Sequence, residues 1–217
     1  MHTKSEHQLI DVEQNRDKYI GGSDLPYILG KATYKYGKSR IEFAKEKLGL
    51  LPRGKGNEYT YYGQVMEPKV RNYINKLLGY HFIEASIVDE NRKYRANTDG
   101  VDKACHTILE VKTFSKSLDI SYYEPQCQFY MELYNCDVCL LVGYDRPEGF
   151  YTGISFDIES TDEYFDFTFD EERVHIYKIY RDYEKFKEME IEINKFKYLL
   201  TCLKEEVILN GNEFRTS

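Results

Sequence analysis

The hydrophobic positions of the chain change their period along the sequence, and the first part has the period of helices. Apolar residues recur every three or four positions between glycines, which is typical of amphipathic helices. The helices expected there are 24–29, 39–48 and 62–78. Ser39 and Glu42 have the spacing of a capping box, and Ser23 is the expected N-cap of the first helix. Pro68 indicates a kink or a late start in the third.

The middle of the chain has the short apolar runs of a sheet, and the last part returns to a helical period. The expected strands are 81–88, 94–99, 108–112, 138–144 and 151–156, with one helix at 121–135. An acidic connector at 157–172 follows, and residues 171–209 are expected to be helical. Their apolar stripe consists of Ile176, Ile179, Tyr183, Phe186, Ile193, Phe196, Leu200 and Leu203. This order predicts an α/β fold with a mixed central sheet flanked by helices and a helical C-terminal tail.

Length and composition favour a single domain over two. The 217 residues contain no repeat or flexible linker, so we divide one domain into N-terminal helices (1–80), a mixed-sheet core (81–156) and a connector with C-terminal helices (157–217). No apolar run has transmembrane length and the first 17 residues are polar, so neither a membrane segment nor a signal peptide is expected. We therefore expect a cytoplasmic protein.

Net charge and the cysteines bear on two kinds of site, one for nucleic acid and one for a metal bound by sulfur. The net charge of −7 argues against a protein that coats nucleic acid generally, but a local basic patch can still hold DNA. The five cysteines are an odd number, and reduced thiols are expected. Cys136 and Cys139 form a lone CxxC without the further ligands of a zinc or iron–sulfur site. Because Cys139 lies in an apolar run, we interpret it as a buried structural thiol.

The main candidate for chemistry is Asp99-Gly100 followed by Glu110-Val111-Lys112. Side chains alternate along a strand, so Glu110 and Lys112 point to one face and Val111 to the other. Asp99, at the end of the preceding strand, can converge with Glu110 on Mg²⁺, and the Val111 carbonyl can complete the protein ligands. Lys112 can then activate a water or stabilise charge on a phosphate. The alternative is a hairpin turn at Asp99-Gly100 and a solvent-facing pair at Glu110 and Lys112.

Three further motifs add to this candidate, although each also has an ordinary structural interpretation. Glu67 falls on the apolar stripe of the third helix and therefore faces inward, or else lies at the edge of the stripe. Gln126 and Tyr130 share one face of a helix, where Gln126 can bond a phosphate or water or remain a surface amide. The glycines before Ser23 expose backbone N–H groups as an anion site that Arg16 can join, unless Ser23 is only a cap.

Taken in order along the chain, these motifs resemble the phage lambda exonuclease/YqaJ viral recombinase family of the PD-(D/E)xK nuclease superfamily. The resemblance covers Arg16 to Tyr144, although Thr98-Asp99 replaces the superfamily's Pro-Asp. It implies a restriction-endonuclease-like core and a 5′→3′ exonuclease on double-stranded DNA ends. Such an enzyme uses Mg²⁺, for which Mn²⁺ can substitute, and leaves 3′ single strands for recombination by an annealing protein. It also implies a closed ring, preferably a trimer, in the host cytoplasm if the chain is phage-encoded.

The resemblance also implies roles for individual residues. Asp99, Glu110 and the Val111 carbonyl would hold metal, with Glu67 assisting a second metal or water and Lys112 assisting the nucleophile. Gln126, supported by Tyr130, would lie beside the scissile phosphate, and Arg16 and Ser23 would bind the 5′-terminal phosphate. The CRISPR-associated nucleases that share this core carry an iron–sulfur cluster, but the cysteine positions here do not match theirs, so no cluster is expected. Two alternatives remain: a restriction-like or RecB-type DNA endonuclease, and a catalytically inactive module that binds DNA ends.

Overall fold

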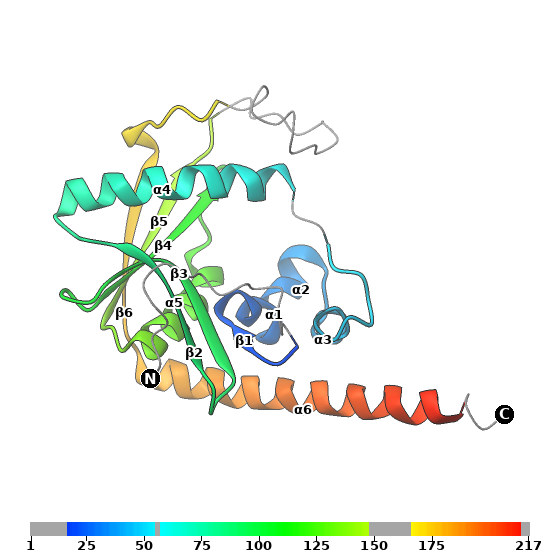
Figure 1. Cartoon of the computed structure of the whole chain (residues 1–217). Helices are drawn as coiled ribbons and strands as arrows, with labels where there is room; N and C mark the ends of the chain where they lie inside the picture. Colours follow the sequence, from blue (N-terminus) through cyan, green and yellow to red (C-terminus); the bar gives the residue numbers. More distant parts are fainter. Residues whose placement is uncertain (1–16, 55–56, 148–165, 214–217) are drawn as a thin grey trace.

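The described part of the chain is one mixed sheet with helices on both faces (Figure 1). The computed structural model describes residues 17–54, 57–147 and 166–213. The first elements are β1 (Ile20–Gly21), η1 (Gly22–Asp24), α1 (Leu25–Ile28), α2 (Lys31–Tyr36), α3 (Arg40–Lys47) and α4 (Glu58–Leu78). The others are β2 (Ile83–Asp89), β3 (Tyr94–Asp102), β4 (Thr107–Phe114), α5 (Ile120–Tyr134), β5 (Val138–Asp145), η3 (Glu171–Arg173), β6 (Val174–Tyr180) and α6 (Tyr183–Glu213). The predicted fold class is confirmed.

The sheet has a fork at its centre, between β3 and β4. The strand order is β1-β3-β4-β5-β6, with β2 paired to β3 outside this path. The antiparallel pairing of β3 with β4 covers only Gly100–Asp102 against Thr107–Leu109. Further along, β4 continues in parallel register with β5, while the start of β3 pairs with β1. The last pair before the strands separate is Gly100 with Leu109. Asp99 and Glu110, the next residues outward on the two strands, therefore lie at the fork.

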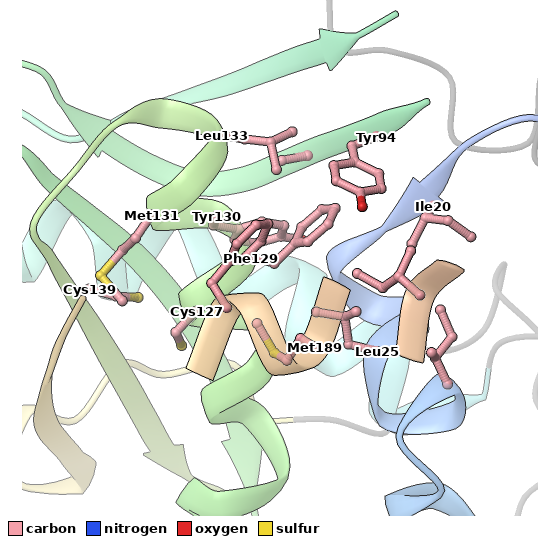
Figure 2. Packing of buried hydrophobic residues seen from close by; sticks show 14 of the residues in the cluster. Ile20, Leu25, Tyr94, Cys127, Phe129, Tyr130, Met131, Leu133, Cys139 and Met189 are labelled. Carbon is pink, nitrogen blue, oxygen red and sulfur yellow. The ribbon is translucent and has the colours of Figure 1, made fainter. Parts of the chain in front are cut away.

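Two hydrophobic cores cover the two faces of the sheet. The first packs α1, α3, α5 and α6 against one face; Figure 2 shows part of it, with Tyr94 of β3 and Phe129 of α5 among its members. The second packs α4 against the opposite face, where Leu109 and Val111 contribute side chains. Ile108 belongs to the first core, so the alternation along β4 directs Glu110 and Lys112 toward the α5 side. This confirms the predicted face of these two residues.

The N-terminal helices differ from the prediction in their caps and number. Ser23 lies exposed inside η1, so its prediction as an N-cap is wrong; Asp24 is the N-cap of α1. The capping box of Ser39 and Glu42 is confirmed at the start of α3. The prediction missed α2, a helix of six residues that follows Gly30 and is too short to show a period. Short helices of this kind depend on tertiary contacts.

Helix α4 begins earlier than predicted and continues through Pro68. Asn57 caps it by accepting a hydrogen bond from the Thr60 backbone N–H, so the helix begins at Glu58, four residues before the predicted start. A proline removes the hydrogen bond to the carbonyl four residues earlier. That residue is Gln64, and both it and Pro68 are exposed, so water can replace the missing bond. The predicted late start is therefore wrong.

The largest error concerns the segment before the final helix. Residues 174–180 were expected to be helical, but they form β6, antiparallel to β5. Ile176 and Ile179 are three residues apart, a spacing that suits a helix; on the strand they point to opposite faces, and only Ile179 is buried. The segment is rich in β-branched and aromatic residues, and the edge of β5 supplies its partner. The local period of hydrophobic residues cannot predict pairing with a strand that is distant in the sequence.

Several other expectations have mixed outcomes. The Asp99-Gly100 hairpin is wrong, because β3 continues to Asp102 and the turn lies at residues 103–106. Cys139 is buried as predicted, and all five cysteines are free thiols. Arg16, the predicted strand 151–156 and most of the acidic connector lie outside the described residues. No helix in the described ranges is long and apolar enough to cross a membrane.

Candidate active site

Asp99 and Glu110 lie across the fork of the sheet. Since β3 and β4 have separated at this point, the Val111 N–H donates to Asp99 Oδ2 at 2.6 Å instead of to a β3 carbonyl. Gly100 allows the close approach behind it, because a Cβ there would lie 2.7 Å from Phe82 Cβ and 3.1 Å from Leu109 Cβ. The strand geometry therefore turns the two carboxylates toward one region.

Glu110 is almost fully buried among polar partners. Its Oε1 accepts from Gln126 Nε2 at 2.7 Å and is 2.5 Å from Lys112 Nζ. Its Oε2 is buried and has no hydrogen-bond partner among the residues that the structure describes. Burial, together with the charge of Asp99, raises the pKa of Glu110 to about 8. A buried carboxylate oxygen without a donor is the arrangement expected where a cation binds.

The charges around this pair differ in sign. Burial raises the pKa of Asp99. Burial alone would lower the pKa of Lys112, but the Glu110 and Asp99 carboxylates raise it above its usual value, so this lysine remains cationic. The site therefore holds two carboxylates beside a permanent positive charge, a combination suited to a metal ion and a phosphate.

Glu67 reaches the same region from α4 on the other face of the sheet. Burial, followed by the charge of Asp99, raises its pKa to about 7. Arg71, one turn later, donates to Glu67 Oε1 at 3.2 Å and also to the backbone carbonyl of Asp99. It also forms an ion pair with Glu84 of β2. Arg71 therefore connects α4 to β2 and β3, and the helical spacing from Glu67 could have identified it in the sequence.

Gln126 and Tyr130 form a buried pair on α5, as their spacing predicted. Gln126 Nε2 donates to the Tyr130 hydroxyl at 2.9 Å in addition to Glu110. One amide hydrogen therefore holds the Glu110 carboxylate, and the other is held by the Tyr130 hydroxyl. The interpretation of Gln126 as a surface amide is wrong, since only 5% of the residue is exposed.

The glycine turn before α1 packs directly on this pair. A Cβ at Gly22 would lie 2.4 Å from Tyr130 Cε1 and 3.1 Å from Gln126 Cγ. The turn is closed by Asp24, whose Oδ2 accepts from the Gly21 N–H at 2.9 Å and from Lys47 Nζ at 2.7 Å. This buried ion pair was missed, because residues 24 and 47 are far apart in the sequence.

Gly22→Ala is expected to lower the free energy of unfolding by about 1–3 kcal/mol, because the added methyl overlaps a ring that cannot move without losing its partners. Gly21→Ala is the matched control: its Cβ would meet no atom closer than 3.8 Å. Urea unfolding of both variants measures the difference. Equal stabilities would show that the contact at Gly22 does not constrain the pair.

The fork fits a hard divalent cation with few protein ligands. Within the described ranges, no group of three or more His, Cys, Asp or Glu side chains is arranged to hold a metal. Two carboxylates and one backbone carbonyl are enough for a cation that keeps several waters. The unpartnered Oε2 of Glu110 and the carboxylate of Asp99 match that set, and the backbone of Val111 contacts Asp99 through its N–H.

The predicted anion site is only partly visible. Ser23 is exposed beside Gly22, so the turn reaches the surface next to the Gln126–Tyr130 pair. Arg16 lies outside the described residues. The structure therefore brings together seven of the predicted residues around the fork, and Ser23 follows Gly22, which packs on Tyr130. The seven are Glu67, Asp99, Glu110, Val111, Lys112, Gln126 and Tyr130.

Comparisons with known proteins identify a family and similar folds. Residues 12–139 match the family model described as "YqaJ-like viral recombinase domain". A phage-related exonuclease from Haemophilus somnus 129PT is 20% identical, with a TM-score of 0.65 over 87% of this chain and 96% of that one. An alkaline exonuclease from Laribacter hongkongensis is 17% identical, with a TM-score of 0.66 over 92% and 96% of the two chains. Among curated proteins, none matches the sequence.

Proposed function

The chain belongs to the YqaJ-like viral recombinase domain family and is a nuclease, and from this premise we propose that it degrades linear double-stranded DNA from 5′ ends. The observation that carries the proposal is the carboxylate pair at the fork, in which Glu110 keeps one buried oxygen without a partner in the described part of the chain. The similar folds of two exonucleases support the choice of an exonuclease. One of them was also solved in complex with dAMP, so we infer deoxynucleoside monophosphates as products.

We assign the metal site to Asp99, Glu110 and the Val111 carbonyl, with Mg²⁺ as the expected ion and Mn²⁺ as its substitute. When bound, such an ion polarises the phosphate and makes water a nucleophile near neutral pH. Gln126 fixes the Glu110 carboxylate in one orientation through one of its amide hydrogens. Tyr130 in turn accepts the second hydrogen of that amide, so α5 sets the direction of the carboxylate.

Lys112 and Glu67 have separate roles in this proposal. The Lys112 ammonium, held 2.5 Å from Glu110, stabilises negative charge that develops on the phosphate. Glu67, whose pKa is raised to about 7, can accept a proton from water or assist a second ion. Arg16 and Ser23 remain our proposed ligands of the 5′-terminal phosphate, next to the glycine turn.

The proposal extends to the assembly and its setting. A closed ring of three subunits would keep the enzyme on the duplex, and α6 exposes apolar residues that can contribute to subunit contacts, among them Ile191, Val207 and Leu209. Light scattering of the full chain tests this part, and a monomer at micromolar concentration would remove it. We also propose that an annealing protein takes up the 3′ strand. The chain would act as one nuclease domain, in the host cytoplasm.

The function is tested with end-labelled linear duplex and covalently closed circular duplex in the presence of Mg²⁺. We expect digestion of the linear DNA alone, and about tenfold faster digestion of 5′-phosphorylated than of 5′-hydroxyl ends, since a terminal phosphate gains charged hydrogen bonds at the anion site. Arg16→Ala should remove most of this preference while cleavage chemistry persists.

Each other outcome has a distinct meaning. Cutting of the closed circle identifies a restriction-like or RecB-type endonuclease. Binding to ends without any cleavage identifies an inactive end-binding module. A phosphate preference near one in the unmodified chain contradicts the roles of Arg16 and Ser23 without affecting the metal site.

A further inference from the structure

A cluster of tyrosine and lysine side chains lies where α2 meets the first turns of α5 (both in Figure 1). We call it the tyrosine–lysine surface, and it consists of Lys35, Tyr36, Tyr122 and Tyr123. The two helices are tied together by Lys31 Nζ, which donates to the Ser121 carbonyl at 2.6 Å. The surface therefore combines residues that are almost ninety positions apart in the sequence.

The geometry of the surface is that of a cation among aromatic rings. Lys35 Nζ lies 4.4 Å from the ring centroid of Tyr122 and 5.5 and 5.6 Å from those of Tyr123 and Tyr36. Tyr122 meets its two neighbours edge to face, at centroid separations of 5.1 and 5.9 Å. These contacts fix the rings: Tyr122 is buried, Tyr123 is half-buried, and Tyr36 has 59% of its surface exposed and free for stacking.

The tyrosine–lysine surface continues into the active site. The ring of Tyr123 lies 5.4 Å from Lys112 Nζ, which is itself paired with Glu110. The order from outside to inside is therefore Tyr36, Lys35, Tyr123, Lys112 and Glu110. A strand of DNA whose phosphate reaches Glu110 has its neighbouring nucleotides within reach of the rings.

We propose that the tyrosine–lysine surface binds unpaired bases of the DNA strand that is being cut, next to the scissile phosphate. This inference rests on the proposed function. Exposed aromatic rings stack on bases of any sequence, and an interleaved cation attracts the backbone phosphates. On a chain with a net charge of −7, such local cations are needed to attract a polyanion.

The local charge balance supports this ligand. Among the ion pairs found in the described ranges, none includes Lys35, so no short contact with a carboxylate neutralises it. Asp119, the N-cap of α5, has a carboxylate that accepts hydrogen bonds from the Ser121 hydroxyl and the Tyr122 N–H. This carboxylate is therefore used to cap the start of α5.

The inference is tested by fluorescence anisotropy of the full chain with a labelled single-stranded oligonucleotide, in a chelator that prevents cleavage. Tyr36→Ala is expected to weaken binding about tenfold, whereas Tyr36→Phe keeps the stacking ring and should stay within about twofold of the unmodified chain. Lys35→Ala should weaken binding and reduce its salt dependence by about one phosphate contact. Tyr198→Ala is the matched control, because this tyrosine is 73% exposed on α6.

The outcomes separate this inference from the proposed function. Equal binding by the unmodified chain and Tyr36→Ala would overturn it, and so would an equal effect of Tyr36→Ala on a covalently closed duplex, which offers phosphates but no free bases. Circular dichroism confirms that each variant is folded. Cleavage with Mg²⁺ but no dependence on Tyr36 rejects only the surface. Binding that depends on Tyr36 without cleavage rejects only the exonuclease.

Discussion

Replacing Glu110 with glutamine is expected to reduce DNA cleavage by at least about 10³-fold while the chain remains folded. The substitution keeps the shape of the side chain and the oxygen that accepts from Gln126 Nε2, so the packing of α5 on the sheet is retained. It removes the buried oxygen that has no partner among the described residues, and with it the negative charge of a proposed metal ligand. Loss of metal-assisted charge stabilisation is worth several kcal/mol, which corresponds to this factor.

Thermal unfolding supplies a measurement that does not depend on activity. Mg²⁺ should raise the melting temperature of the unmodified chain, because an ion that binds only the folded state stabilises it, and Glu110→Gln should abolish this increase. A carboxyl pKa raised to about 8 means that, without metal, the unmodified chain loses stability as the pH rises toward that value. Glutamine does not titrate, so this pH dependence should be smaller in the variant.

Glu192→Gln is the control for this experiment, since Glu192 forms surface ion pairs with Arg40 and Lys195 on the far side of the first core. It should change neither cleavage nor the response to Mg²⁺. Full cleavage by Glu110→Gln would reject the assignment of the metal site, whatever the family of the chain.

The parts of the fold that were predictable are those coded by neighbouring residues. The capping box at Ser39 and the stripe of α4 identify their helices because caps and periods act over a few positions. The strand β6 was not predicted because its partner β5 is about 35 positions away in the sequence, and only pairing with that partner decides between strand and helix. Pro68 led to a predicted late start that is wrong, because the proline lies on the exposed face of α4, where water can replace the lost hydrogen bond.

The candidate site shows the same division between local and distant information. Alternation along β4 was enough to place Glu110 and Lys112 on one face. The convergence of Asp99 and Glu110 depends on the fork, where β3 and β4 stop pairing, and no local pattern encodes a point of separation. The ion pair of Asp24 and Lys47 was not predicted for a related reason: its two residues are distant in the sequence, and only the fold brings them together.

Lys112→Ala is the second change for which we expect a large effect, a reduction of the chemical step by about 10²–10³-fold. The ammonium lies 2.5 Å from Glu110 and remains protonated, so we expect it to stabilise charge on the phosphate without a proton transfer. Removal also affects Glu110, because the positive charge lowers the pKa of that carboxyl. Without it the pKa of Glu110 rises further, and the acid limb of the pH–rate profile should move to higher pH.

Single-turnover cleavage at several pH values measures both effects, and DNA affinity in a chelator should change much less than the rate. Lys112→Arg keeps the charge and should restore the position of the acid limb, although its wider head group fits less well beside the Tyr123 ring. Lys103→Ala, at an exposed lysine in the turn after β3, is the matched control and should behave as the unmodified chain. A Lys112→Ala rate within about threefold of the unmodified chain, with an unshifted pH profile, would mean that the lysine serves only to neutralise the buried glutamate, since tenfold corresponds to about 1.4 kcal/mol.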